Sequence, residues 1–195
     1  MFRTRKIVPV VVLVALALAT SVRGQPRVDG GAQEGVEAYL RGVADFFDVE
    51  AEEVSILGEW RLPADEIPVL LFFTQRTGVS SDALAALRRN GGSWADLANR
   101  FGLSTQSFHT SLPEGRPGPL SRVVSEYGSL PAARWRNLPL TDEEITALVN
   151  LRFLAGYLHV SPAAVMEGWE RAGSFAGAYR LLRGPPEDAA APVPF

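Results

Sequence analysis

The sequence predicts an all-α protein, a small multi-helix array built from two or three related short helical units around two apolar central helices. Three observations support this fold class. Serines suited to helix N-caps recur just before short apolar segments, and glycines follow where each helix would stop. Two longer apolar segments open with acidic residues. A self-similarity at a spacing of 81 residues relates the two halves of the chain.

Residues 1–24 have the pattern of a secretory signal peptide. Three basic residues lie within the first six, an unbroken apolar run covers 7–19, and small residues follow. This run of 13 residues is shorter than the roughly 18 expected of a membrane span. We therefore expect an exported protein, periplasmic or extracellular, with no transmembrane anchor after cleavage behind Ala19 or Gly24. An uncleaved signal anchor is the alternative.

The composition excludes several classes of site. The 195 residues contain no cysteine, which excludes disulfides, thiolate metal sites and a lipid anchor on cysteine. Without residues 1–24 the chain holds 15 Lys and Arg against 22 Asp and Glu, a formal net charge of −7. Such an acidic chain lacks the electrostatic footprint of a protein that binds nucleic acid or an anionic membrane. Lys6 is the only lysine, and this preference for arginine is typical of a GC-rich bacterial genome.

The chain divides into six segments. Two helical halves are separated by a connection rich in Pro, Gly and Arg, and segments rich in Gly, Pro and Ala flank them. The segments are a signal peptide (1–24), a disordered linker (25–34), helical half 1 (35–112), the connection (113–140), helical half 2 (141–183) and a disordered tail (184–195).

The first apolar central helix is predicted in "DEIPVLLFFTQRTG", residues 65–78. Pro68 falls in its first turn, where proline is tolerated. Residues 69–73 are apolar on every side, which indicates a buried helix, although a buried strand is the alternative for so short a run. The second central helix is predicted in 141–158, where Thr141 and Glu144 form a capping-box pattern.

The repeated unit is two short helices joined by a Gly-Ser elbow. Residues 78–98 align without a gap on 159–179, and a weaker third copy starts at Val49. Four serines are the expected N-caps, and an aromatic residue follows the second serine of each unit at the first turn of the next helix. The caps are Ser80, Ser93, Ser161 and Ser174, and the aromatic residues are Trp94 and Phe175.

The stretch "GGSWADLANRFGLS", residues 91–104, resembles the first half of a helix-turn-helix. The would-be recognition helix, "STQSFHTSL", contains no Arg or Lys to reach phosphate or guanine, and it stops at Pro113. The counterpart in the second half has lost the turn. We therefore expect a generic helix corner and no nucleic-acid partner.

The connection holds the candidate partner-binding loop. Five prolines interrupt it, and one short helix is expected at 120–127. Its "RWR" motif sets a tryptophan between two arginines, and these residue types are enriched at interface hot spots. The alternative is that the tryptophan anchors the connection to the helices while the arginines stay in water. The candidate residues are Arg116, Arg122, Tyr127, Arg134, Trp135 and Arg136.

No catalytic, cofactor-binding or metal site is predicted. His159 falls at a helix-end corner, where capping explains it, and His109 has the context of a half-exposed surface residue. The acidic pairs at 52–53, 65–66 and 142–144 all open helices, where the helix dipole and solvation account for them. No nucleophile elbow accompanies these residues.

The sequence therefore favours an exported, non-enzymatic interaction or structural module. Its partner would be another exported protein or an envelope component, because repeated helical units form grooves without dedicated chemistry. A small cell-envelope hydrolase is the alternative. A helix-turn-helix-like regulator is the second alternative, if the signal peptide is misread.

Overall fold

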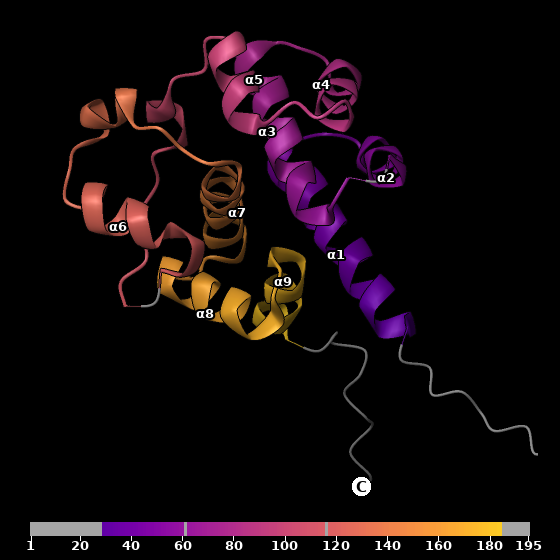
Figure 1. Cartoon of the computed structure of the whole chain (residues 1–195). Coiled ribbons are helices and arrows are strands. Elements are labelled where there is room, and N and C mark those ends of the chain that lie inside the picture. Colours follow the sequence, from indigo (N-terminus) through magenta and orange to yellow (C-terminus); the bar gives the residue numbers. More distant parts are fainter. Residues whose placement is uncertain (1–28, 61, 116, 185–195) are drawn as a thin grey trace, which may run out of the picture.

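The computed structural model describes residues 29–60, 62–115 and 117–184. This part of the chain contains nine α-helices, four short 3₁₀ helices and no strand, which confirms the all-α prediction (Figure 1). The α-helices are α1 (Asp29–Phe47), α2 (Ala51–Glu59), α3 (Ile67–Thr77), α4 (Ser81–Arg89), α5 (Trp94–Arg100), α6 (Ser121–Tyr127), α7 (Asp142–Leu158), α8 (Pro162–Ala172) and α9 (Phe175–Arg183). The 3₁₀ helices are η1 (Ala64–Glu66), η2 (Thr105–Phe108), η3 (Gly118–Leu120) and η4 (Ala132–Asn137).

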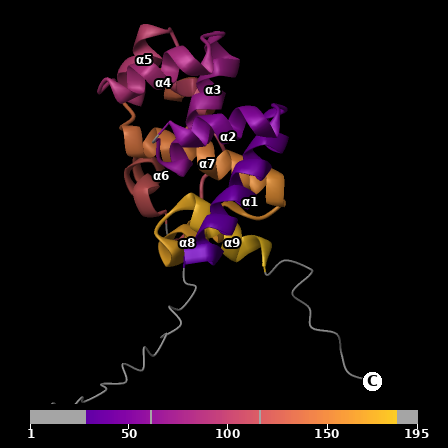
Figure 2. The ribbon, with the colours of Figure 1, turned by 90° about the vertical axis from the view of Figure 1, so that its right-hand side faces the viewer.

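Helix α7 lies at the centre of the molecule. It contacts α1, α3, α5, α8 and α9 as well as three of the 3₁₀ helices. Helices α3, α4 and α5 form one end of the molecule and α8 and α9 the other, with α2 and α7 between them (Figures 1 and 2). Because α1 packs on α9, the first and last described helices meet at the same end.

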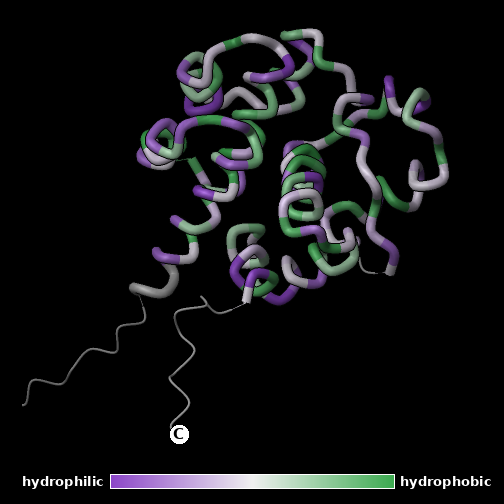
Figure 3. Tube along the Cα trace, turned by 180° about the vertical axis from the view of Figure 1, so that it is seen from behind, coloured by the Kyte–Doolittle hydropathy of each residue, from purple (hydrophilic) through white to green (hydrophobic). Residues whose placement is uncertain are grey.

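The two apolar central helices are confirmed as α3 and α7. Residues 67–77 form an α-helix, which excludes the strand alternative. Every residue of α3 from Ile67 to Phe73 is buried. Residues 147–151 of α7 are also buried without interruption, so the middle of this helix is enclosed on all sides. Seen from behind, hydrophobic and hydrophilic residues are both present on the central helix and on the helices around it (Figure 3).

The two copies of the repeat have the same structure. Helices α4 and α5 of the first copy correspond to α8 and α9 of the second, and in each copy both starting serines accept a hydrogen bond from the first turn of their helix. The helices that precede the two copies, α3 and α7, also end at equivalent positions of the repeat. The residue after each is left-handed, Gly78 with φ 72° and His159 with φ 54°. His159 is therefore a helix C-cap, as its position in the repeat predicts.

The third copy is related over its first helix. Helix α2 has the same length as α4 and starts 30 residues earlier. Its second helix is replaced by η1, which continues directly into α3. Glu50 also supplies no side-chain cap to α2, so this copy lacks the Gly-Ser elbow.

The structure departs from the predicted linker and agrees with the short helix expected in the connection. Helix α1 begins at Asp29, inside the predicted linker 25–34. It packs against α9, and Gly35 lies close to the Arg180 side chain of that helix. The connection contains η3, α6 and η4, of which α6 matches the expected short helix. The predictions for residues 1–24, 25–28 and 185–195 lie outside the described residues.

The helix-turn-helix resemblance ends at α5. Gly102 turns the chain with φ 70°, and residues 105–108 then form only the single 3₁₀ turn of η2. A one-turn 3₁₀ segment is too short to lie along a DNA groove as a recognition helix does. The stretch is a helix corner, as the sequence predicts.

A buried amide on α7 holds four elements together. Asn150 is fully buried and accepts a hydrogen bond from the Tyr39 hydroxyl of α1. Its Nδ2 donates to the backbone oxygens of Asp65 in η1 at 2.8 Å and Thr146 at 2.9 Å. The Asp65 carboxylate in turn accepts from the first backbone N–H groups of α9, those of Phe175 and Ala176, both at 2.9 Å. Burial raises the pKa of Tyr39 well above its usual value, and the charge of Asp65 adds to this, so the hydroxyl remains a donor.

We predict that Asn150→Ala lowers the free energy of unfolding by about 3 kcal/mol, because it leaves the Tyr39 hydroxyl without its acceptor and opens a cavity. Tyr39→Phe should cost about 1 kcal/mol, and the double variant should cost less than the sum because the two side chains share one interaction. Urea denaturation measures all three. Tyr157→Phe is the matched control, since that hydroxyl bonds Asp45 at 2.8 Å at an exposed position, and it should change stability by less than about 0.5 kcal/mol. Additive costs for Asn150 and Tyr39 would contradict the network.

Candidate functional site

An arginine joins the two helical halves where η1, α4 and α7 meet. Arg88 of α4 makes a bidentate ion pair with Glu66 of η1, with both N–H···O distances at 2.8 Å. Its Nη1 lies 2.8 Å from Oδ2 of Asp142, the first residue of α7, and donates to the Gly92 backbone oxygen at 3.0 Å. We call Glu66, Arg88 and Asp142 the Arg88 cluster. The hydrogen bonds that Arg88 donates to Glu66 raise the pKa of Arg88 above its usual value, so its charge is permanent.

The Arg88 cluster also fixes the elbow of the first repeat. The Arg88 guanidinium lies 5.3 Å from the ring centroid of the buried Trp94, within the range of a cation–π contact. Asp142 Oδ1 accepts from the backbone N–H of Ala95 at 3.2 Å, in the first turn of α5. The elbow conformation is therefore held by a residue of the second half.

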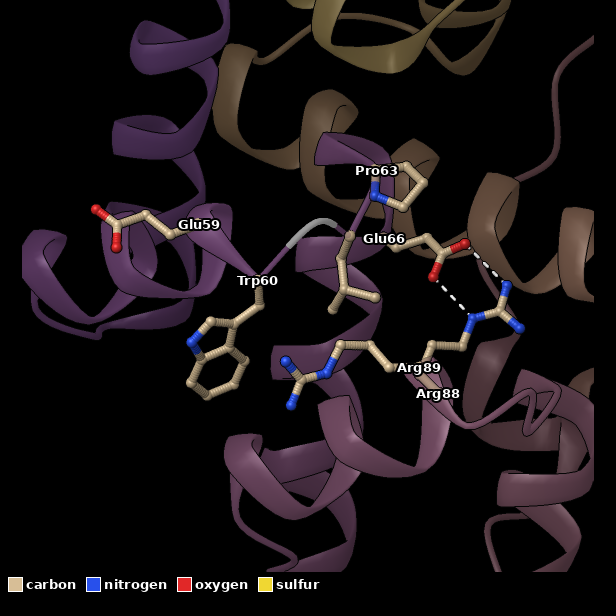
Figure 4. Close-up of a pocket in the computed structure, with 7 residues that line it drawn as sticks. Glu59, Trp60, Pro63, Glu66, Arg88 and Arg89 are labelled. Carbon is tan, nitrogen blue, oxygen red and sulfur yellow. Dashed lines mark hydrogen bonds and ion pairs between the residues drawn. The ribbon is translucent and has the colours of Figure 1, made fainter.

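A hollow of about 680 Å³ lies on one side of this cluster (Figure 4). We call it the Trp60 hollow, after the half-buried tryptophan in its wall. The Arg89 guanidinium lies 5.5 Å from the Trp60 ring centroid, and the two side chains lie together while Glu59 points away from them (Figure 4). Glu66 and Arg88 close the opposite wall, and the full lining is Glu59, Trp60, Leu62, Pro63, Glu66, Arg88 and Arg89.

A smaller hollow of about 250 Å³ shares Pro63, Glu66 and Arg88 with the first. We call it the Trp169 hollow. It is also lined by Asp65, Pro119, Asp142, Glu143, Thr146, Trp169 and Phe175. Both hollows thus combine one half-buried tryptophan with carboxylates and at least one arginine.

The carboxylate that both caps α9 and lines the smaller hollow is Asp65. Burial raises its pKa above the usual 3.8, and the backbone hydrogen bonds from Phe175 and Ala176 partly oppose this. Its oxygens are occupied by those two donors at 2.9 Å. Asp65 therefore positions α9 by accepting from the first N–H groups of that helix.

The candidate partner-binding loop predicted from the sequence is used largely for internal contacts. Arg122 is bound to Glu144 by Nε at 2.9 Å and Nη2 at 2.5 Å, and Nη2 donates to the Pro139 oxygen at 2.7 Å. Trp135 is buried, with the His109 ring 4.8 Å away edge-on, which is the anchoring arrangement named as the alternative.

The other described members of the loop differ in exposure. Arg134 and Arg136 are exposed on either side of Trp135, and Tyr127 is half-buried at the end of α6. Arg116 lies outside the described residues. A binding role for Arg134 and Arg136 stays a prediction.

The acidic pairs at helix starts have structural partners. Glu66 and Asp142 bind Arg88, and Glu144 binds Arg122 while accepting from the Thr141 backbone N–H in the predicted capping box. His109 lines neither the Trp60 hollow nor the Trp169 hollow. The arrangement supplies charge and shape for binding, and the carboxylates of Asp65, Glu66 and Asp142 are engaged in ion pairs and caps.

Two other kinds of site were sought in residues 29–60, 62–115 and 117–184. No three His, Asp or Glu side chains gather there in a way that could hold a metal ion. No helix in these ranges is long and apolar enough to cross a membrane.

Sequence reasoning missed the residues that form the two hollows. Glu66, Arg88 and Asp142 are far apart in the sequence. The two acids were explained by the helices that they open, and Arg88 was not singled out. Trp60 follows α2 in the weakest copy of the repeat. The one available signal was that Arg88-Arg89 places two cations in the last turn of a helix in an acidic chain.

Comparisons with known proteins give no family for this chain: no protein-family model matches it, and no curated protein or solved structure is significantly similar to it.

The raised pKa of Asp65 predicts a pH effect on stability. In the folded state this carboxyl takes up a proton at a higher pH than in the unfolded chain, so the native state binds more protons over the interval just above pH 3.8. The Asp65 contribution to the free energy of unfolding should therefore fall as pH rises through that interval and level off above it. The measurement is the difference between wild type and Asp65→Asn in urea denaturation at successive pH values. A difference that rises with pH, or does not change, would contradict the assignment.

Proposed function

We propose that the protein is an exported, non-enzymatic binding module whose Trp60 hollow receives a segment of another exported protein. The observation that carries the proposal is the Trp60–Arg89 pair, a half-buried tryptophan with a guanidinium 5.5 Å from its ring, in the wall of a hollow of about 680 Å³. Tryptophan and arginine are the residues most enriched at binding hot spots. The volume falls within the range typical of ligand sites.

The charges in the hollow indicate the chemistry of the partner segment. Arg88 is neutralised by Glu66 and Asp142, whereas the exposed Arg89 has no ion pair within the described part of the chain. A segment with an acidic side chain beside an apolar one would pair with Arg89 and cover Trp60, Leu62 and Pro63.

The Arg88 cluster supports binding by holding the walls in place. Glu66 and Arg88 are joined by two hydrogen bonds of 2.8 Å, so the wall opposite Trp60 has a defined geometry before any ligand arrives. Such pre-organisation lowers the entropic cost of association.

The partner test is affinity purification of the tagged protein from the envelope fraction of its source cell, with quantitative mass spectrometry of co-purifying proteins. Trp60→Ala and Arg89→Ala should each weaken recovery of the specific partner, with affinity falling about tenfold or more in a binding titration with that partner. Circular dichroism and urea denaturation verify that both variants are folded.

Arg134→Ala with Arg136→Ala is the matched control. These arginines are exposed, like Arg89, but lie in η4, away from the residues that line the hollow. Partner binding should survive this change. Loss of binding in the η4 variant with full binding in Trp60→Ala would overturn the Trp60 assignment and favour the loop predicted from the sequence.

The export half of the proposal has its own test. A reporter active only outside the cytoplasm, fused at a site after residue 184, should be active with the native residues 1–24 and inactive when the apolar run 7–19 is interrupted by charged residues. Activity that does not depend on this run, or an inactive native fusion, would refute export.

A further inference from the structure

Two arginines approach the same phenylalanine on a different part of the surface. Arg76 of α3 and Arg152 of α7 have their guanidinium carbons 5.3 Å and 5.2 Å from the centroid of the Phe72 ring. Helices α3 and α7 pack against each other, and Phe72 is 4% exposed between them and Phe108 of η2. Both cations therefore lie near one buried ring, and we call them the Arg76–Arg152 pair.

Backbone carbonyls hold Arg152 in place. Its Nη2 donates to the backbone oxygens of Ser107 at 3.0 Å and His109 at 2.6 Å. Within the described residues its Nε and Nη1 have no hydrogen-bond partner, although the side chain is half-buried. The guanidinium is thus oriented through one nitrogen and keeps donors available on the others.

The charge of the pair is not neutralised by the protein. Neither Arg76 nor Arg152 forms an ion pair with a described residue, whereas Arg88 and Arg122 each bind a carboxylate through two nitrogens. Burial lowers the pKa of Arg152 below its usual value, and the positive charge of Arg76 lowers it further. Two neighbouring cations without a counter-charge, of which Arg152 is partly desolvated, are an unfavourable arrangement that a bound anion would relieve.

We propose that the Arg76–Arg152 pair binds an oxyanion, a phosphate or carboxylate group of a small ligand that carries two negative charges. Guanidinium groups present paired N–H donors that match the oxygens of these groups. A dianion would match the two positive charges. This site is separate from the Trp60 hollow and does not depend on the function proposed for it.

The experiment is isothermal titration of the purified protein at low ionic strength with two probes, inorganic phosphate and succinate. We expect saturable binding of at least one probe below about 10 mM. Binding of phosphate alone identifies a phosphate site, and binding of succinate alone identifies a carboxylate site; either result supports the proposal. Absence of binding by both probes overturns it.

Arg76→Gln should lower the affinity for the bound probe about tenfold, because it removes one charged donor. Arg76→Lys should restore part of this affinity. Arg76 is exposed, so these variants are expected to fold. Arg152→Gln also removes the hydrogen bonds to the backbone oxygens of Ser107 and His109. Its affinity is therefore compared only if its circular dichroism spectrum matches that of the wild type.

Arg100→Gln is the matched control. Arg100 is also exposed, with its guanidinium carbon 5.5 Å from the Phe101 ring, and it tests an arginine–aromatic contact outside the pair. It should leave the affinity unchanged. An equal loss in Arg100→Gln, or full affinity in Arg76→Gln, would show that the anion is attracted by general charge or binds elsewhere, and would overturn the proposal.

Discussion

The arrangement of this protein depends on one buried amide. The middle of α7 is buried on all sides. The amide of Asn150 lies there, so it must form its hydrogen bonds inside the protein. It does so through Tyr39 of α1 and the backbone oxygen of Asp65 in η1. Asp65 then caps α9 with its carboxylate. The positions of η1 and α9 relative to the central helix follow from this chain of bonds. The walls of both hollows depend on it in turn, since η1 supplies Glu66 to both.

The arginines of the chain fall into two groups with different consequences. Arg88 and Arg122 lie at the boundary of the two halves, and each binds a carboxylate at the start of α7. Arg88 also binds a second carboxylate, from η1. These ion pairs have structural roles, since they connect segments that apolar packing alone would leave loosely oriented. Arg89 and the Arg76–Arg152 pair have aromatic neighbours but no carboxylate partner within the described chain. In an acidic protein such cations are the groups with interaction energy still available for a ligand.

Local signals predicted the fold better than the site. A serine cap acts within three residues and a glycine stop within one turn, so the bounds of α4, α5, α8 and α9 could be read from the repeat. The left-handed position of His159 was visible because Gly78 occupies the same place one repeat earlier. The Arg88 cluster offered no such signal, since Glu66 and Asp142 each look like ordinary helix-start acids. Trp135 shows the same limit, because a sequence does not show whether an aromatic residue in a proline-rich connection faces a partner or, as here, the core.

The sequence by itself determined the all-α class, the two central helices and the repeated elbow, since each depends on contacts between near neighbours along the chain or on an uninterrupted apolar run. It also supports the prediction of an exported binding module, through residues 1–24 and the lack of catalytic motifs. Only the tertiary structure decided which charges are neutralised and which remain open. That outcome depends on side chains brought together from different helices, and the free energy of a charge is set by its surroundings in space rather than by its neighbours in sequence.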